Sequence, residues 1–199
     1  LMSGTSADGI EASLISISTN RSKKRLEHRT KLIAHRSFPF SKGLRKRILM
    51  ASELPGMERS LDQQSTSALT LLHYDLGERF AAAAIGVAES AGTPLNKVST
   101  IGSHGQTVCH RPLRGEKAIS ATFQIGEIAI IAERTGTTVV GDFRPSDIAA
   151  GGLGAPLTPY AHGTLFSSRE RPVLIVNLGG ICNITWVPAG FDGERAKDM

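Results

Sequence analysis

Aromatic residues and cysteines are scarce in this chain of 199 residues, and their scarcity excludes several classes of protein. Phe, Trp and Tyr together make up 5% of the sequence, so the base-stacking surfaces that bind single-stranded nucleic acid are not expected. The two cysteines, Cys109 and Cys182, have no metal-ligand spacing and suit a reducing compartment. No run of about 18 apolar residues is present, so no transmembrane helix is expected. These absences predict a cytoplasmic protein with no membrane partner.

Acidic residues are nearly missing from one segment of the chain. Residues 21–47 contain eleven Lys or Arg and one acid, Glu27, for a local charge of +10, whereas the whole chain has a net charge of +5. The rest of the chain is therefore acidic, at −5. Because the core of this segment lies between two strand-like runs, we interpret it as a solvated hairpin tip and expect no nucleic-acid partner. A polyanion-binding patch is the alternative.

Hydrophobic periodicity predicts a mixture of strands and helices. Alternation over residues 11–18 and an extended run over 32–38 predict an antiparallel hairpin. The longest helix is predicted to begin near Ser60, the first residue of a capping box, and to end before Gly92. Its apolar stripe consists of Leu69, Leu72, Leu76, Phe80, Ala83 and Val87. We expect further helices at 41–50, from Gly126 to Arg134 with Gly136 as cap, and at 158–166, and strands at 98–102, 118–123, 137–140, 173–176 and 181–187.

Polar, glycine-bearing loops follow three of the predicted strands. They are Ser103-His104-Gly105-Gln106-Thr107, Gln124-Ile125-Gly126 and Gly141-Asp142-Phe143-Arg144-Pro145. Because ligands of open α/β sheets bind at the carboxyl ends of the strands, we expect these loops to line one crevice.

A hydroxyl-rich loop opens the chain. The Walker A motif Gly-x-x-x-x-Gly-Lys-[Ser/Thr] is absent, which disfavours a P-loop fold. Instead, Met2-Ser3-Gly4-Thr5-Ser6-Ala7-Asp8-Gly9 offers backbone N–H groups and small hydroxyls that suit an oxyanion. Asp8-Gly9 also has the composition of a type I′ hairpin turn. A second glycine-containing strand-turn-strand surrounds Asn177-Leu178-Gly179-Gly180.

Two such hairpins resemble the paired phosphate loops of the actin, hexokinase and Hsp70 superfamily. The three loops above, the opening loop, Gly154-Ala155-Pro156-Leu157 and Asn177-Leu178-Gly179-Gly180-Ile181 occur in the order seen in the anhydro-N-acetylmuramic acid kinase family. This resemblance implies an α/β fold of the RNase-H-like (actin-like ATPase) type, with a mixed sheet flanked by helices. A first domain would span residues 1–170, with its first strand truncated, and the beginning of a second such domain would span 171–199.

The same resemblance implies an activity and its cofactors. Such kinases use ATP and Mg²⁺ to phosphorylate 1,6-anhydro-N-acetylmuramic acid at O6 with hydrolytic opening of the anhydro ring, which gives N-acetylmuramic acid 6-phosphate in peptidoglycan recycling. We expect the chain alone to be inactive, because half of the nucleotide cleft would be missing. The alternatives are a levoglucosan-type kinase and a non-catalytic relic that binds a ligand or polyanion. Whether the protein forms a homodimer is left open by the sequence.

Site residues follow from the matched motifs. Asp142 is expected to be the general base, and Pro145 favours an extended chain that places Asp142 and Arg144 on one side. Arg144 would then keep Asp142 ionised or bind the lactyl carboxylate.

Asp8 is expected to hold Mg²⁺ through water. The nucleotide-binding residues would be Ser3, Gly4, Thr5, Ser6, Asp8, Gly9, Asn177, Gly179 and Gly180, and the substrate-binding residues His104, Gln106, Thr107, Gln124 and Arg144. For His104 a purely structural role is the alternative. The family often has Trp at Cys109 and a larger residue at Ala7. Asn177 replaces an Asp common in the superfamily, which leaves open whether the second hairpin helps to hold the metal.

Overall fold

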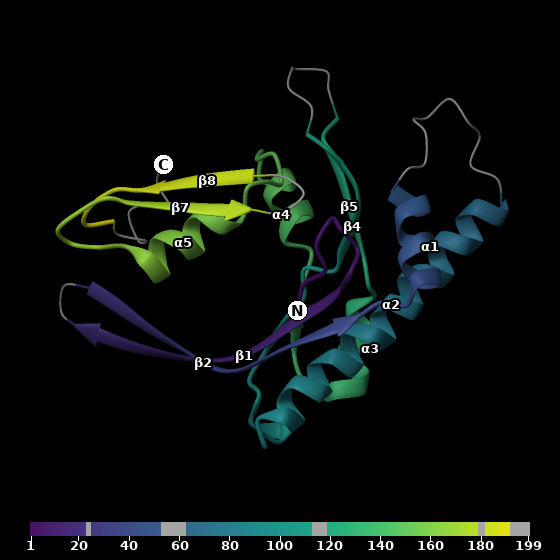
Figure 1. The fold of residues 1–199 in the computed structure, drawn as a ribbon, viewed down its shortest axis with the longest axis horizontal. Coiled ribbons are helices and arrows are strands. Elements are labelled where there is room, and N and C mark those ends of the chain that lie inside the picture. Colours follow the sequence, from purple (N-terminus) through teal and green to yellow (C-terminus); the bar gives the residue numbers. More distant parts are fainter. Residues whose placement is uncertain (23–24, 53–62, 113–118, 179–181, 192–199) are drawn as a thin grey trace. The chain divides into compact units, whose positions relative to one another are not determined.

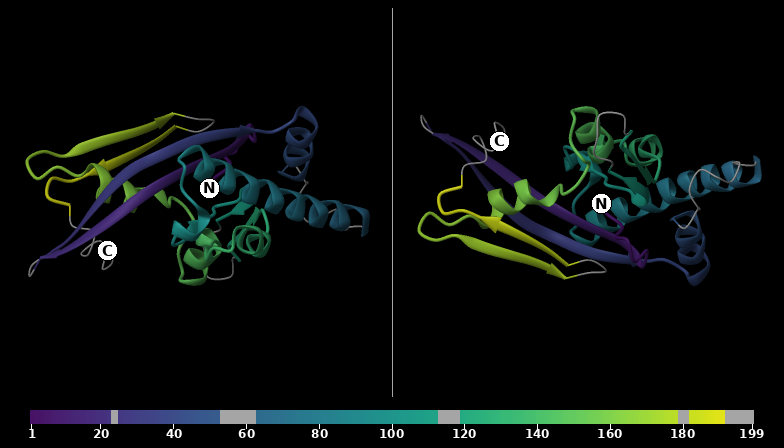
Figure 2. Two further views of the ribbon diagram at one scale, coloured as in Figure 1. Left: turned by 90° about the horizontal axis from the view of Figure 1, so that it is seen from below. Right: turned by 90° about the horizontal axis from the view of Figure 1, so that it is seen from above.

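A computed structural model describes residues 1–22, 25–52, 63–112, 119–178 and 182–191 of the chain. It is a mixed α/β structure with two compact units (Figure 1). The first unit contains residues 1–15 and 32–153, and the second contains residues 16–31 and the described chain from Gly154 onward. The hairpin of β1 (Gly9–Ser22) and β2 (Arg25–Pro39) contributes to both units and forms the long paired ribbon of Figure 2. This confirms the predicted hairpin, with longer strands, whereas the side chains of residues 20–28 at its basic tip lie outside the described ones.

The first three residues lie between two other segments of the first unit. The backbone N–H groups of Met2 and Glu11 each donate to the other residue's carbonyl, at 3.0 and 2.8 Å, which pairs the segment with β1 in antiparallel fashion. On its other side Ser3 forms a parallel bridge with Gln106. The short strands β3 (Ile101–Gly102) and β6 (Val139–Val140) are also parallel neighbours. The described strands form four two-stranded sheets, and the isolated bridges of Met2 and Ser3 add one antiparallel and one parallel pairing within the first unit.

A second hairpin corrects the predicted limits of two segments. β4 (Gln106–Arg111) pairs with β5 (Ala121–Ile125) in antiparallel register, with an irregularity between Thr107 and Cys109. Gln106 and Thr107, predicted to be loop residues, begin β4, and Gln124 lies within β5. The strand was not predicted because its first residues are polar. Gln106 is nevertheless 1% exposed and lies opposite Ile125 in the core. Residues 113–118 lie outside the description.

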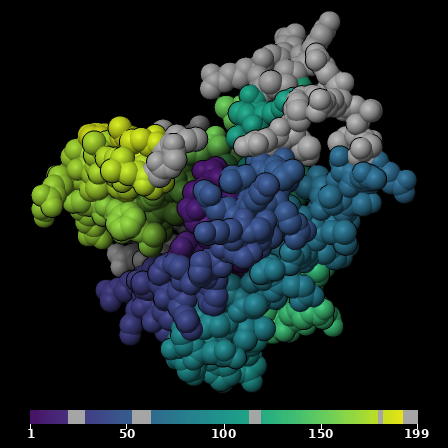
Figure 3. All heavy atoms as spheres, turned by 45° about the vertical axis from the view of Figure 1, so that its right-hand side comes forward, coloured from purple at the N-terminus to yellow at the C-terminus, as the bar shows by residue number. Residues whose placement is uncertain are grey.

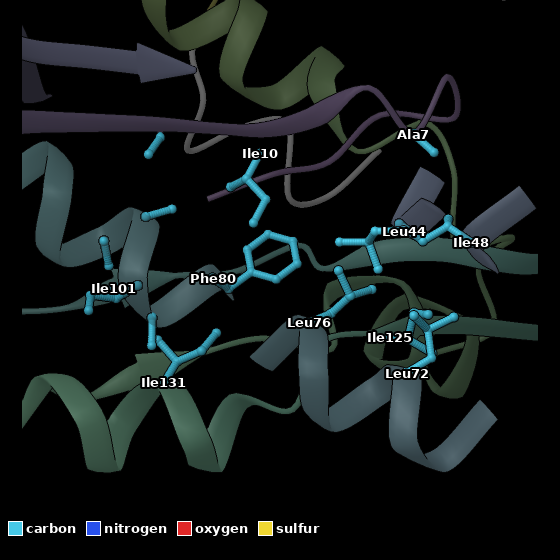
Figure 4. Close-up of a cluster of buried hydrophobic side chains, with 14 of the residues drawn as sticks. Ala7, Ile10, Leu44, Ile48, Leu72, Leu76, Phe80, Ile101, Ile125 and Ile131 are labelled. Carbon is cyan, nitrogen blue, oxygen red and sulfur yellow. The ribbon is translucent and has the colours of Figure 1, made fainter. Parts of the chain in front are cut away.

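The long helix α2 (Gln63–Ser90) supplies most of the core of the first unit. Its predicted stripe is buried from Leu72 to Val87, and the predicted capping box at Ser60 lies outside the described residues. Figure 4 shows Phe80 and Leu76 of α2 among side chains from other elements of this unit. These side chains include Ile10 of β1, Leu44 and Ile48 of α1 (Lys42–Ser52), Ile101, Ile125, and Ile131 of α3 (Ile128–Thr135). Burying each of these large side chains contributes roughly 1.5–3 kcal/mol.

The remaining helices agree in part with the sequence. α3 ends at Gly136, whose φ of 62° is left-handed, as predicted for a cap. A short 3₁₀ helix, η1 (Leu95–Lys97), follows α2, and α4 (Phe143–Ala149) occupies a segment predicted to be extended. Among the helices of the described ranges, none is long and apolar enough to cross a membrane.

The second unit contains one helix and one hairpin from the C-terminal part of the chain. α5 (Thr158–Phe166) has the predicted bounds. β7 (Val173–Leu178) and β8 (Cys182–Val187) form the predicted antiparallel hairpin. A hydrogen bond of 2.9 Å between His162 Nδ1 and Thr185 Oγ1 joins α5 to β8.

We expect Phe80→Ala to lower the free energy of unfolding by about 3–5 kcal/mol, because it leaves a cavity where the ring is fully buried. Urea unfolding followed by circular dichroism measures this loss. Leu71→Ala is the matched control on the same helix, since Leu71 is 67% exposed and its truncation should change stability by less than about 0.5 kcal/mol. Equal losses for both variants would contradict the described core.

Candidate functional site

The opening loop is a hairpin loop, but not of the type I′ form. It lies between the paired residues Met2 and Glu11 and contains a tight turn in which Ala7 N–H donates to Gly4 O at 3.0 Å. The left-handed residue is Ala7, with φ 51°, and neither Asp8 nor Gly9 is left-handed. The type I′ assignment of Asp8-Gly9 is therefore wrong. Gly9 is required for a different reason, because a Cβ there would lie 2.5 Å from the Phe38 carbonyl oxygen of β2.

The hydroxyl groups of this loop have different environments. Ser3 is 2% exposed, and its Oγ donates to Gln106 Oε1 at 2.6 Å. Its backbone N–H donates to Gly105 O at 3.3 Å. Thr5 and Ser6 are exposed. Ser3 thus anchors the loop to β4, and Thr5 and Ser6 face the solvent from which an oxyanion would arrive.

Asp8 is held at the surface by a cation from α1. Arg45 Nε lies 3.0 Å from Asp8 Oδ1 and also donates to Ser6 O at 3.1 Å. Figure 3 shows the purple N-terminal residues against the blue residues of this region. An exposed ion pair is worth at most about 1 kcal/mol, so it can exchange for other partners of the carboxylate. An exposed carboxylate suits a hydrated Mg²⁺ ion. Hydroxyl groups and a guanidinium suit phosphate oxygens, to which they can donate hydrogen bonds.

Three predicted loops converge at the ends of their strands. Ser103 N–H donates to Val140 O at 2.9 Å, so the residues that follow β3 and β6 are adjacent. A Cβ at Gly141 would lie 3.3 Å from Ser103 O. A Cβ at Gly105 would lie 2.8 Å from Ile125 O, at the end of β5. The three loops are therefore adjacent, and the expectation that they line one crevice stays a prediction.

Asp142 is the N-cap residue of α4 and has a left-handed backbone. Its φ of 53° and ψ of 36° show that the chain is not extended there, so the prediction that Asp142 and Arg144 share one side of an extended segment is wrong. Pro145 lies in the first turn of α4, where its missing N–H has no helical partner to lose. Asp142 is exposed and makes no capping hydrogen bond with its side chain. Its carboxylate therefore faces solvent at the end of β6.

His104 and Arg144 form a hydrogen bond between two of the converging loops. Arg144 Nε donates to His104 Nε2 at 2.9 Å. Because arginine is a donor only, Nε2 accepts and the ring proton is on Nδ1, which donates to Gly105 O at 3.1 Å. Burial lowers the pKa of His104 most, the bond to Gly105 opposes this, and the positive charge of Arg144 lowers the pKa further. Both ring nitrogens of a neutral imidazole are thus used within the protein.

The two predicted glutamines differ in their hydrogen bonding. Gln106 accepts from Ser3 and donates to Thr107 O at 3.1 Å, so it links neighbouring backbones inside the protein. Gln124 Nε2 donates to Thr122 Oγ1 at 2.8 Å and to Thr107 Oγ1 at 3.3 Å. These bonds orient the amide and leave the buried Gln124 Oε1 without a hydrogen-bond partner among the described residues. A buried acceptor of this kind is suited to a donor from a ligand or water.

Two features of the site were missed by sequence reasoning. Ser103 Oγ is buried without a hydrogen-bond partner in the described ranges, at the end of β3. His73 of α2 holds the turn after β5: its Nδ1 accepts from Gly126 N–H at 3.0 Å and its Nε2 lies 3.1 Å from Glu127 Oε2. Glu127 caps α3, and the Ala129 N–H bond is the main cause that lowers its pKa. The position of Ser103 within a predicted loop was the one available signal.

The second predicted phosphate hairpin belongs to the second unit. Asn177 is exposed on β7 and pairs with Asn183 of β8. Gly179 and Gly180, both predicted to approach phosphate, lie outside the described residues.

These features are those of a mixed α/β chain and are consistent with a sugar-kinase-like domain. The family model for anhydro-N-acetylmuramic acid kinase matches residues 1–194, and the chain belongs to this family. Anhydro-N-acetylmuramic acid kinase of Bacillus cereus strain G9842 is 39% identical over 194 residues, which cover 98% of this chain and 48% of that protein. The enzyme of the same name from Caldanaerobacter subterraneus is 40% identical over 195 residues, covering 96% of the chain and 46% of that protein. The chain spans about half the length of these curated relatives.

We expect Ser3→Ala to lower the free energy of unfolding by about 1–3 kcal/mol, because it leaves Gln106 Oε1 buried without its donor. Urea unfolding of the chain measures the change. Ser6→Ala is the matched control in the same loop, and its exposed side chain predicts a change within about 0.5 kcal/mol. A Ser3 variant as stable as the Ser6 variant would show that the buried hydrogen bond does not anchor the loop.

We expect His104 to titrate below its ordinary pKa of 6.5 and to carry its proton on Nδ1 when neutral. The unfolded chain then binds more protons than the folded one between the lowered pKa and 6.5, so His104 makes the free energy of unfolding rise as the pH rises through this window. Nitrogen-detected NMR of the imidazole measures both the pKa and the tautomer. Arg144→Met should raise the pKa by removing a positive charge, and a neutral ring protonated on Nε2 would refute the described hydrogen bond.

Proposed function

We propose that this chain supplies the first catalytic half of an ATP-dependent kinase acting on 1,6-anhydro-N-acetylmuramic acid. The product would be N-acetylmuramic acid 6-phosphate, formed in the recycling of cell-wall sugars. The observation that carries this proposal is membership of the family over residues 1–194. The exposed Asp142 at the convergence of the three loops supports it, since the reaction needs a base that can reach a ligand.

We also propose that residues 1–170 form an RNase-H-like (actin-like ATPase) domain and that residues 171–199 begin a second one. The mixed pairing of Leu1–Ser3 with β1 on one side and with the chain after β3 on the other supports a mixed sheet. The packing of α2 and α3 into the core supports helices beside it. The glycine-containing β7–β8 hairpin supports a repeat of the opening hairpin.

In the proposed reaction Asp142 removes a proton from water. The water oxygen attacks C1 of the sugar, the C1–O6 bond breaks, and O6 takes the γ-phosphoryl group as its bond to the β-phosphate oxygen breaks. A 1,6-anhydro sugar has no free O6 hydroxyl, so opening the ring is what creates the phosphoryl acceptor. The left-handed backbone of Asp142 places its carboxylate before α4, and the carbonyl of the same residue accepts from Ser146 N–H at 3.0 Å. This backbone hydrogen bond fixes Asp142 at the start of α4, while its carboxylate remains exposed.

The opening loop is the proposed site for nucleotide phosphates, and bound ATP with Mg²⁺ would supply the phosphoryl group and neutralise its charge. Thr5 and Ser6 would donate hydroxyls, and Asp8 would hold the metal through water after leaving Arg45. Ser3 would hold the loop in place through its buried hydrogen bond to Gln106. From the second unit, Asn177, Gly179 and Gly180 are proposed to bind phosphate.

Buried polar groups near the end of β5 are proposed to bind the sugar. Gln124 Oε1 needs a donor, and the acetamido N–H or a ring hydroxyl of the substrate would provide one. Thr107 is fixed by the same amide. Gln106 is buried behind these residues and would support their positions.

We expect Asp142→Asn to lower kcat by about 10²- to 10⁴-fold, as for loss of a general base. The measurement is ADP release with 1,6-anhydro-N-acetylmuramic acid, in a protein of the relatives' full length that contains this chain. Glu89→Gln is the control, because it removes an exposed acid of α2 that is not among the proposed site residues. Near-normal turnover by the Asp142 variant would reject the assignment, and faster phosphorylation of levoglucosan than of the amino sugar would reject the substrate.

A further inference from the structure

We propose that Arg45 of α1 binds the phosphate oxygens of the nucleotide, although it lies outside the opening loop. This assignment rests on the proposed function, which requires a nucleotide at that loop. Arg45 belongs to no sequence motif of the chain and is one of the many basic residues of segment 21–47. The contacts of its side chain distinguish it from the other cations of that segment.

Core packing fixes α1 beside the opening loop. Leu44 and Ile48 of α1 are 4% and 0% exposed, and Ala7 of the loop is fully buried in the same cluster of side chains (Figure 4). The backbone N–H of Phe40, shortly before the helix, donates to Asp8 O at 2.9 Å. The loop and the helix therefore share one core within the first unit, and a side chain of α1 that reaches the loop extends from a fixed backbone.

One nitrogen of the Arg45 guanidinium holds this side chain against the loop. Its Nε donates to Ser6 O at 3.1 Å and to Asp8 Oδ1 at 3.0 Å. A guanidinium has five N–H donors, and these two contacts share one of them. The N–H groups of the terminal nitrogens, Nη1 and Nη2, make no hydrogen bond or ion pair within the part of the chain that the structure describes. Because the side chain is 47% exposed, an anion in solvent can reach these donors.

The groups around Arg45 match the charges of nucleotide phosphates with a metal ion. Thr5 and Ser6 are exposed hydroxyls, and Asp8 suits a hydrated Mg²⁺ ion. A guanidinium binds phosphate through charge-assisted N–H bonds, which are stronger than hydrogen bonds between neutral groups. The bond from Arg45 to Ser6 O does not involve Asp8, so it can keep the guanidinium at the loop when the carboxylate turns to the metal.

Arg47 offers a matched comparison on the same helix. Its Nη1 lies 3.2 Å from Asp75 Oδ2 of α2, and its side chain is 50% exposed. Arg45 and Arg47 are therefore alike in charge, in exposure and in pairing with an aspartate. Arg47, however, makes no hydrogen bond or ion pair with the opening loop among the described residues. Only Arg45 should therefore affect the binding of a nucleotide.

Nucleotide binding tests the proposal without depending on turnover. In a protein of the relatives' full length that contains this chain, isothermal titration calorimetry measures two dissociation constants. One is the Kd of a non-hydrolysable ATP analogue with Mg²⁺, and the other is the Kd of 1,6-anhydro-N-acetylmuramic acid. We expect Arg45→Gln to raise the Kd of the nucleotide about 10- to 100-fold, the range for losing charge-assisted hydrogen bonds. The Kd of the sugar should change by less than about twofold, because the contacts of Arg45 are with the phosphate loop.

Two further variants make the comparison specific. Arg47→Gln should leave both dissociation constants within about twofold of the wild-type values, as for an exposed ion pair away from the site. Arg45→Lys should bind the nucleotide more tightly than Arg45→Gln and more weakly than the wild type, because it keeps the charge and loses the planar fork.

A double variant separates direct binding of phosphate from an effect through Asp8. In an Asp8→Asn background, Arg45→Gln should still weaken nucleotide binding, by about 10-fold or more, because its own bonds to phosphate are lost. No further loss in that background would show that Arg45 acts only by holding Asp8, and this would overturn the proposal.

Two other results would also overturn the proposal and leave the proposed function intact. Tighter nucleotide binding by Arg45→Gln would show that the guanidinium obstructs the metal site, and equal losses for nucleotide and sugar would show a role in the fold alone. A wild-type protein that binds the nucleotide but does not phosphorylate the anhydrosugar would instead overturn the proposed function, while the binding data would still decide the role of Arg45.

Discussion

The buried hydrogen bond from Ser3 Oγ to Gln106 Oε1 is the contact on which the candidate site depends. It is 2.6 Å long and joins residues that are 103 positions apart in the chain. Through it the opening loop is tied to the first residue of β4, next to the chain that follows β3. A buried polar pair is costly to separate, because each group would lose its partner without gaining water. The loop therefore keeps its place while Thr5, Ser6 and Asp8 remain exposed.

Around this contact the chain places polar groups by two different means. Short parallel strands end side by side, which brings Ser103 next to Gly141. Side chains then connect these loops, as Arg144 does with His104 and as His73 does with Gly126. Hydrogen bonds of this kind orient a group more narrowly than packing alone, since donor and acceptor must align. The arrangement suits a site in which charges must face a ligand in fixed directions.

Sequence patterns succeeded where structure is local. The stripe of α2, the glycine after α3 and the bounds of α5 depend on residues within a few turns of each other, and these predictions were confirmed. The predictions were wrong where the local structure depends on contacts with residues distant in the sequence. β4 was hidden because Gln106 is polar yet buried opposite Ile125, and the extended segment after Asp142 was wrong because that residue is left-handed and starts α4.

The sequence by itself determined the family, since its motifs and their order survive in the linear chain and match over residues 1–194. It also determined which residue types stand at the strand ends. Only the tertiary structure decided the partners: that Ser3 turns inward to Gln106, that Asp8 meets Arg45, and that both nitrogens of His104 are occupied. The physical reason is that a polar side chain takes whichever partner the folded backbone brings within about 3 Å, and that partner can lie anywhere in the sequence.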